Sequence, residues 1–357
     1  MVDDNPKNLQ VLGNLLSNDG YSVEFALNGL DALDRIKKKV FDMILLDVMM
    51  PEMDGFEMCR ILKADKKHKN IPVIFLSART DMDYIIQGFD LGAVDYIYKP
   101  FNKQELLSRI STHFELKKSR DIIEQYAKDL EVKNKLITQS INYGKEIQSA
   151  VLLSGFEPLK EFREHFLLFK PKDIISGDFF WSYKIDDLII IAMVDCTGHG
   201  VPGALMSMLG VAFLTETIVS EGITKTDVIL NKLSYKIINA LSQKGIIGEV
   251  HDGMDVTIIS INLKYKTLEF SGAFNSVFLI HDDNLILLKG DRRSVGYAES
   301  MHSFTSHQSK LLKDDVIYMF TDGYPDQFGG EKDSKFKIQS FMKLLLEIHN
   351  SFEIVPV

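Results

Sequence analysis

The sequence predicts two folded domains of different classes, an α/β domain in front and an α+β domain behind, joined by a helical linker. Three observations lead to this expectation. Residues 1–116 alternate short apolar runs with helical patterns, which implies a doubly wound parallel sheet. Residues 117–150 contain no such runs and are dense in Lys, Glu, Asp and Gln. From 151 to 357 strand patterns follow in series, with the helices set apart.

In the front domain, helices are expected over Asn5–Ser17, whose leucines share one face, and over Leu30–Lys39. The expected strands are Tyr21–Ala26, Asp42–Leu46, Pro72–Leu76 and Val94–Ile97. The last three are apolar at successive positions, as in strands that are buried on both faces. A doubly wound sheet places its functional site at the carboxyl ends of its strands.

In the linker, one apolar residue recurs every seven positions: Leu116, Ile123, Leu130 and Ile137. The companion positions of this repeat are poor in apolar residues: Ser119, Tyr126, Lys133 and Ser140. The pattern predicts a helix and leaves two alternatives open, a single solvated helix and a dimeric coiled coil.

In the rear domain, the expected helices cover residues 203–220, 225–243 and 338–348. The expected strands are Leu188–Val194, Val256–Leu263, Leu268–Phe270, Val277–Ile280, Leu285–Leu288 and Val316–Phe320.

The composition limits the functional class. The net charge of −9 argues against nucleic acid as the main partner, because binding to phosphates needs a basic face. Two cysteines, Cys59 and Cys196, provide no disulfide framework, which fits a reducing cytoplasm. The apolar stretch Ala204–Val219 is interrupted by polar residues and is expected to be a buried helix, not a membrane span. We therefore expect a cytoplasmic protein without a membrane or nucleic-acid partner.

Four chemically useful positions lie at strand ends in the front domain: Asp3-Asp4, Asp47, Ser77 and Lys99. Carboxylates brought together in this way repel one another unless a cation lies among them, and Mg²⁺ suits oxygen ligands. Lys99 would add a mobile positive charge, and Ser77 a hydroxyl for a transferred phosphoryl oxygen. Asp47 would be the nucleophile that forms an acyl phosphate.

The motifs VDDNP, LLDVMMPEMDG, FLSA and DYIYKPF resemble those of the response-regulator receiver domain of two-component signalling. The resemblance implies a flavodoxin-like fold and a sensor histidine kinase as phosphodonor. It further implies these roles: Asp47 as phosphoacceptor; Asp3, Asp4 and the Met49 carbonyl with Asp47 around Mg²⁺; Ser77 and Tyr96 as switch residues; Lys99 as phosphate partner, aimed by a cis bond before Pro100.

Three acids in the rear domain have a similar setting. Asp195 ends an apolar strand before the loop CTGHG, Asp322 follows the strand VIYMFT, and Asp178 stands in SGDFFW. Each alone is compatible with a turn or a helix cap. Together, without a nearby histidine or cysteine pair, they favour Mg²⁺ or Mn²⁺ over zinc. A two-metal site would activate water and polarise a phosphoryl group.

The motifs SGDFFW, VDCTGHGVPGALMS, GMDVTIISIN and FTDGYPDQFGG resemble the SpoIIE-like branch of the PPM serine/threonine phosphatases. The resemblance implies a β-sandwich flanked by helices that dephosphorylates phosphoserine or phosphothreonine on a STAS-type (anti-anti-sigma) protein. It implies metal binding by Asp195, the Cys196 carbonyl and Asp322, with support from Asp178. His199 is either a general acid or a residue that orders the loop. Asp255, at a strand start, is interpreted as structural.

Both resemblances are incomplete. Only Met1-Val2 precede the acidic pair of the front domain, and no acidic pair with a further strand follows residue 350. We expect a fragment truncated at both ends, and a pseudophosphatase or phosphoprotein-binding scaffold is the alternative function. The domain order suggests that phosphorylation of Asp47 controls the rear domain through dimerisation or rotation of the linker.

Overall fold

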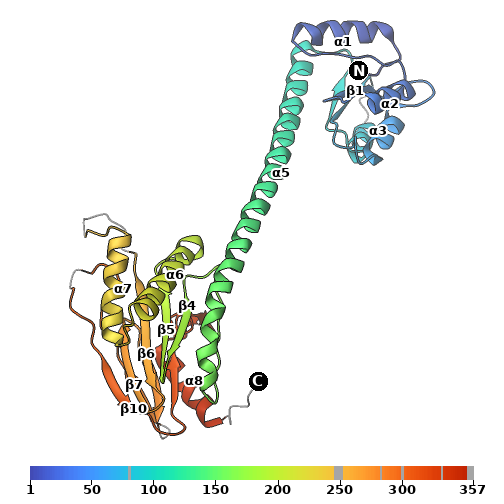
Figure 1. Cartoon of the computed structure of the whole chain (residues 1–357). Coiled ribbons are helices and arrows are strands. Elements are labelled where there is room, and N and C mark those ends of the chain that lie inside the picture. Colours follow the sequence, from blue (N-terminus) through green and yellow to red (C-terminus); the bar gives the residue numbers. More distant parts are fainter. Residues whose placement is uncertain (79–81, 245–251, 282–283, 299–300, 331–332, 352–357) are drawn as a thin grey trace. The chain divides into compact units, whose positions relative to one another are not determined.

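The computed structural model describes residues 1–78, 82–244, 252–281, 284–298, 301–330 and 333–351 (Figure 1). The chain divides into two compact units, Met1–Asn134 and Lys135–Val357. Each unit has its own buried apolar clusters.

The sheet of the first unit is parallel, as expected. Strands β1 (Ile44–Asp47), β2 (Val73–Ser77) and β3 (Asp95–Tyr98) pair in that order. Val2 adds isolated parallel bridges to Ala26 and to Leu46, and so lies between them. The expected strand over Tyr21–Ala26 was wrong in extent, because within the described chain only the short segment around Val2 pairs with it.

Helices cover this sheet, and three of them start at a side-chain cap. The helices of this unit before the linker are α1 (Pro6–Asn18), α2 (Gly29–Lys38), α3 (Gly55–Ala64) and α4 (Met82–Asp90). Asn5, Asn28 and Asp54 cap the first three by accepting a backbone N–H of the first turn. The caps explain why the chain turns into a helix directly after each sheet segment.

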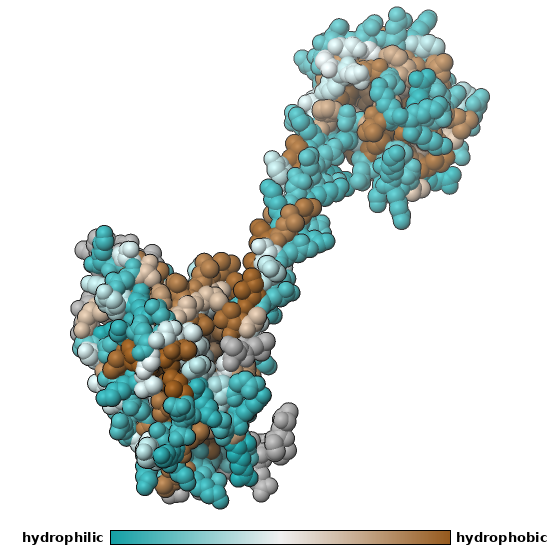
Figure 2. All heavy atoms as spheres, in the orientation of Figure 1, coloured by the Kyte–Doolittle hydropathy of each residue, from teal (hydrophilic) through white to brown (hydrophobic). Residues whose placement is uncertain are grey.

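The linker is part of one helix of 51 residues, α5 (Lys103–Leu153). Its start belongs to the first unit, where Leu106 and Ile110 are buried against β1, β2 and β3 residues. Leu116, Ile123, Leu130 and Ile137 are 58–67% exposed. Figure 2 shows such apolar side chains interrupting the otherwise hydrophilic surface of α5.

Two sheets form the second unit. The larger is antiparallel, in the order β10-β7-β6-β5-β4, and the smaller has the order β11-β8-β9. A two-stranded ribbon of β12 and β13 is separate. The bounds are β4 Phe179–Ile185, β5 Leu188–Cys196, β6 Met254–Asn262, β7 Thr267–Ala273, β8 Val277–His281, β9 Asn284–Leu288, β10 His307–Lys310, β11 Val316–Met319, β12 Phe328–Gly329 and β13 Ser334–Lys335.

The helices flank the sheets in layers. On one face of the larger sheet, α6 (Gly200–Thr215) and α7 (Thr226–Ala240) pack against side chains such as Ile190 and Val194. On its other face, Ile189 and Ile191 contact the smaller sheet. The helix α8 (Ile338–Ser351) packs on that smaller sheet. This β-sandwich flanked by helices confirms the expected fold.

Among the described residues, one helix is long and apolar enough to cross a membrane, Gly200–Ser220. Its main part is α6 and its end is the π-helical η2 (Glu216–Ser220). Its side chains Met206, Val211 and Leu214 belong to the core beneath β5. This packing agrees with the expectation of a buried helix.

Candidate active sites

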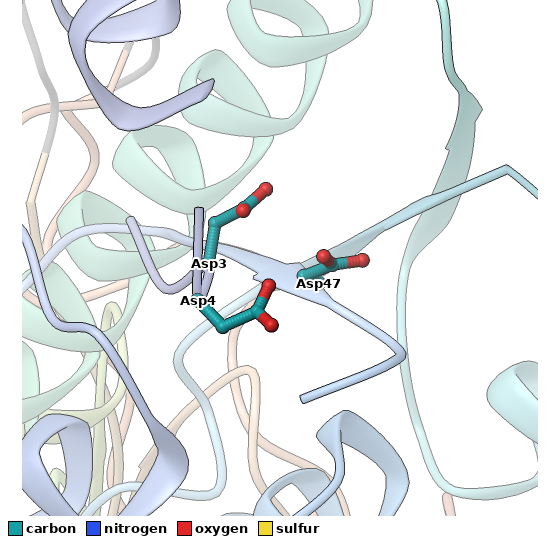
Figure 3. Close-up of side chains that lie close together, drawn as sticks. All are labelled: Asp3, Asp4 and Asp47. Carbon is teal, nitrogen blue, oxygen red and sulfur yellow. The ribbon is translucent and has the colours of Figure 1, made fainter. Parts of the chain in front are cut away.

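The acids of the first unit converge at the carboxyl end of the parallel sheet (Figure 3). Asp3 and Asp4 follow the bridging Val2, and Asp47 is the last residue of β1. Each offers a carboxylate oxygen, and these oxygens all lie within 4.8 Å of one another. Asp3 and Asp47 are buried, whereas Asp4 is exposed.

Lys99 bridges two of these acids. Its Nζ lies 2.8 Å from Asp3 Oδ2 and 2.8 Å from Asp47 Oδ2. Burial raises the pKa of Asp47, and the hydrogen bond and charge of Lys99 offset this only in part. Burial lowers the pKa of Lys99, but its bonds to the two acids outweigh that and the net shift is upward. The peptide bond from Lys99 to Pro100 is cis, as the resemblance implied.

The other predicted residues of this site are spread over the neighbouring strands. Ser77 is buried at the end of β2, and its carbonyl accepts the Lys99 N–H at 2.8 Å. Tyr96 is buried in β3 with its ring 5.9 Å from that of Phe75. The backbone of Met49 donates a hydrogen bond to Asp47.

One supporting residue was missed in the sequence. Asn8, on the first turns of α1, donates from Nδ2 to both carboxylate oxygens of Asp3, at 3.0 and 3.1 Å. The sequence indicates this contact only through Asn5-Pro6, which is typical of a helix start. A helix that begins there brings Asn8 close to Asp3.

The donor set of this cluster fits Mg²⁺. All three groups are carboxylates, which hard cations prefer. A single ammonium group bridges two of the three. A divalent cation would therefore relieve a repulsion that the protein alone compensates only in part.

Strand pairing brings the acids of the second unit together. Phe179 of β4 pairs with Val194 of β5. The next two residues in this antiparallel register are Asp178 and Asp195, which therefore face each other. On the other side of β5, Asp195 pairs with Asp255 of β6. Asp195 and Asp255 therefore lie on adjacent strands, and Asp178 directly precedes the third strand.

Asp322 reaches the same place from the smaller sheet. The neighbouring Thr321 donates from its hydroxyl to Asp178 Oδ2 at 2.9 Å. Burial, and then the charges and hydrogen bonds of Asp178 and Asp322, raise the pKa of Asp195 to about 8. The structure thus unites the three acids singled out in the sequence.

The donors of this second cluster are carboxylates as well, but among the described residues the three acids whose oxygens all lie within 4.8 Å of one another are those of the receiver. Without a cation, burial and the neighbouring Asp178 and Asp322 make ionisation of Asp195 unfavourable and raise its pKa. Burial and the charge of Asp322 likewise raise the pKa of Asp255 to about 6. The oxygen-only donor set and the unrelieved repulsion favour Mg²⁺ or Mn²⁺.

The glycines around Asp195 allow three backbone segments to meet. A Cβ on Gly203 would lie 2.5 Å from the Gly198 carbonyl oxygen, and one on Gly177 would lie 3.2 Å from that of Cys196. The Cys196 side chain belongs to the core, where burial raises the pKa of its thiol. Only the backbone of Cys196 is therefore offered to the site.

His199 lies on this loop with its side chain 73% exposed. Its Nδ1 is 2.7 Å from Asp173 Oδ2. This contact connects the glycine loop to the segment that precedes Asp178, and it supports a role of His199 in ordering the loop. His199 Nε2 does not take part in this contact.

Gln148 is a second residue that the sequence did not reveal. It is buried near the end of α5, and its Nε2 donates to the Ser176 carbonyl at 2.7 Å and to Ser207 Oγ at 2.8 Å. The Ser176 N–H donates back to Gln148 Oε1 at 3.1 Å. A glutamine in a helix with many polar residues carries no local signal of this contact.

Comparisons with known proteins agree with both halves of the chain. The response regulator receiver domain family matches residues 1–111, and the stage II sporulation protein E (SpoIIE) family matches residues 186–353. The SiaA-PP2C domain of Pseudomonas aeruginosa is similar in structure, with 31% identity and a TM-score of 0.54 over 60% of this chain and 83% of that one.

Two curated relatives match part of the chain, and the chain covers 28% and 78% of their lengths. A probable cyclic di-GMP phosphodiesterase of Vibrio cholerae is 38% identical over 34% of this chain and 28% of its own length. The DNA-binding dual master transcriptional regulator RpaA of Synechocystis is 34% identical over 52% of this chain and 78% of its own length. By its two matched domains, the chain belongs to the response regulators through its receiver domain and to the SpoIIE family of PPM phosphatases through the domain behind it.

Proposed function

We propose that this chain is a response regulator whose output is the metal-dependent dephosphorylation of phosphoserine or phosphothreonine on a partner protein of the STAS type. The observation that carries the proposal is the convergence of Asp178, Asp195 and Asp322 from separate strands and from both sheets. The chain spans 28% of the length of one curated relative. The activity of the whole protein is therefore proposed here as well.

In the receiver, Asp47 accepts a phosphoryl group from the phosphohistidine of a sensor kinase. A carboxylate oxygen of Asp47 bonds to phosphorus as the phosphorus–nitrogen bond breaks, and the electron pair stays on the histidine. Mg²⁺ held by Asp3, Asp4, Asp47 and the Met49 carbonyl would neutralise phosphoryl charge. Lys99 pairs with the phosphoryl group, and Ser77 and Tyr96 adjust to it as switch residues.

In the phosphatase domain, Asp178, Asp195, Asp322 and the Cys196 carbonyl would hold Mn²⁺ or Mg²⁺. A bound cation would supply Lewis acidity and would lower the pKa of water, so that hydroxide is available for attack on phosphorus at neutral pH. The acids fix the position of this centre, since their strands are locked in register. When the phosphorus–oxygen bond of the substrate breaks, the leaving alkoxide takes a proton, for which His199 Nε2 is the candidate donor.

The receiver would control the phosphatase through α5. Gln148 connects this helix to Ser176, two residues before Asp178, and to Ser207 on α6. A rotation or shift of α5 that breaks these bonds would move Asp178 relative to Asp195. Phosphorylation of Asp47 is the event that biases the helix between the two states.

A second copy of the chain is the partner we propose for the middle of α5. The heptad positions Leu116, Ile123, Leu130 and Ile137 lie on one stripe and are largely exposed. A parallel pair of α5 helices would cover them. Both matched domains are of soluble signalling types, which supports a cytoplasmic location.

The test is Mn²⁺-dependent release of phosphate from a generic aryl phosphate and from a phosphorylated STAS protein. Wild-type protein should release phosphate only when the metal is present, and Asp195→Ala should not. Retained binding of the phosphoprotein without any metal-dependent release would instead establish a phosphoprotein-binding scaffold.

A further inference from the structure

Asp173 is paired with His199 and with no surface cation. The Nδ1 atom of His199 lies 2.7 Å from Asp173 Oδ2, although the histidine side chain is 73% exposed. Among the described residues, no lysine or arginine lies within ion-pairing distance of Asp173. An exposed pair of this kind contributes little to stability. Its value to the protein therefore lies in where it holds the imidazole ring.

The backbone around both residues is packed to keep this contact. Gly198 and Gly200, which flank His199, have φ angles of +89° and +63°, a conformation that favours glycine. A Cβ on Gly200 would lie 3.4 Å from Asp173 Oδ2, and one on Gly177 would lie 2.9 Å from the Gly198 carbonyl oxygen. The segment from Asp173 to Gly177 therefore lies directly against the loop that carries His199.

That segment is itself anchored in the core. Ile175 and Ser176 are buried, and the Ser176 backbone exchanges hydrogen bonds with Gln148. The segment continues into Asp178, which belongs to the acidic cluster. One short stretch of backbone thus places both an acid of the cluster and the partner of His199.

We infer that Asp173 is a positioning residue for His199. It accepts the Nδ1–H of the ring, so that Nε2 carries the proton given to the leaving group. The inference rests on the proposed function, in which His199 Nε2 is the candidate donor. As the phosphorus–oxygen bond breaks, its electron pair stays on the alkoxide oxygen, which takes the proton from Nε2. The Nε2–H electron pair remains on the ring, and the Nδ1–H stays with Asp173.

The first test compares kcat on two substrates in the presence of Mn²⁺, a phosphoserine peptide and p-nitrophenyl phosphate. The serine alkoxide needs a proton as it leaves, whereas nitrophenolate is stable without one. Asp173→Ala should lower kcat on the peptide at least about tenfold more than kcat on the aryl phosphate. Asp173→Glu should recover part of this difference. His199→Gln should show the same selective loss, and the double variant should add nothing to it, because the two residues act as a unit.

The second test needs no metal. Nitrogen-15 spectra of the histidine side chains at alkaline pH should show the His199 proton on Nδ1 in the metal-free protein. Asp173→Ala should move it to Nε2, where a neutral imidazole in water prefers to carry it. The His199 signal is identified by its loss in His199→Gln. The matched control for both tests is Asp187→Ala, which removes an exposed carboxylate just before the start of β5 and should behave as wild type.

The outcomes separate the possible failures. An equal loss of kcat on both substrates would show that Asp173 only supports the packing of the loop, and would overturn the inference. A His199 tautomer that is the same in wild type and Asp173→Ala would overturn it too. A wild-type protein that releases phosphate from neither substrate would refute the proposed phosphatase function itself.

Discussion

Gln148 and Ser176 exchange two hydrogen bonds, from the Gln148 amide to the Ser176 carbonyl at 2.7 Å and from the Ser176 N–H back to Gln148 at 3.1 Å. The contact joins a helix that begins in the receiver to the backbone two residues before Asp178. It is therefore a direct hydrogen-bonded connection from α5 to the segment that carries an acid of the phosphatase site.

Replacing Gln148 by alanine should lower phosphatase activity and Mn²⁺ affinity. The change leaves two buried backbone groups of Ser176 unpaired, at a cost of about 1–3 kcal/mol for each. The measurement is the rate of phosphate release as a function of Mn²⁺ concentration. Gln139→Ala, at an exposed position of the same helix, is the control and should behave as wild type. Equal effects of both substitutions would contradict the coupling role.

Phosphorylation at Asp47 should change the phosphatase rate. The acyl-phosphate mimic beryllofluoride, added with Mg²⁺, should bind at Asp47 and shift the receiver to its phosphorylated state. Phosphate release with and without the mimic is the measurement, and Asp47→Asn should abolish the difference. Identical rates in the wild-type protein under both conditions would reject control by the receiver.

Replacing Lys99 by methionine should destabilise the receiver in the absence of Mg²⁺. The change strands two buried carboxylates, Asp3 and Asp47, and losing one partner of a buried ion pair costs about 3–5 kcal/mol. Thermal unfolding should show the loss, and Mg²⁺ should restore part of it. A second substitution, Asp47→Asn, should also restore stability because it removes one of the stranded charges. A Lys99→Met protein as stable as wild type without Mg²⁺ would contradict the bridging role.

The metal-free phosphatase domain should become less stable as the pH rises from about 4 to 8. Asp195 has its pKa raised to about 8 in the folded protein, so the folded state holds a proton that the unfolded chain has released. Asp195 alone then lowers the free energy of unfolding by about 1.4 kcal/mol for each pH unit between its two pKa values, and Asp255, whose pKa is raised to about 6, adds to this loss below pH 6. Unfolding in chelator across this range is the measurement.

Asp195→Asn should flatten that dependence and raise the stability of the metal-free domain near pH 8. It should also remove the stabilisation that Mn²⁺ gives. An unchanged slope in the variant would show that another group carries the proton.

Dimerisation should depend on one stripe of α5. Asp substituted at both Ile123 and Leu130 should dissociate the dimer, because it places charges in the predicted seam. The measurement is mass by sedimentation or light scattering over a range of concentrations. Val132→Asp is the control, since Val132 is 60% exposed but lies off the stripe. A wild-type protein that is monomeric at all concentrations would refute this interface.

Much of the architecture follows from local pattern. The apolar runs that became β1, β2, β5, β6 and β8 were placed within one or two residues, because a buried strand needs apolar side chains at successive or alternating positions. Strand β4 was missed, because no strand was expected over Phe179 and its neighbours. Strand β10, with the sequence HQSK, is polar and mostly exposed and carries no strand signal.

The sequence by itself determined the domain classes, the order of the domains and the residues with the right chemistry for two acidic sites, since these depend on residue type and short-range spacing. Only the tertiary structure decided which of those residues meet. The opposition of Asp195 and Asp255, and the contacts of Gln148 with Ser176 and Ser207, join residues 28 to 60 positions apart. Such proximity depends on strand register and helix packing, which arise from burial summed over whole elements and leave no trace in the residues beside each contact.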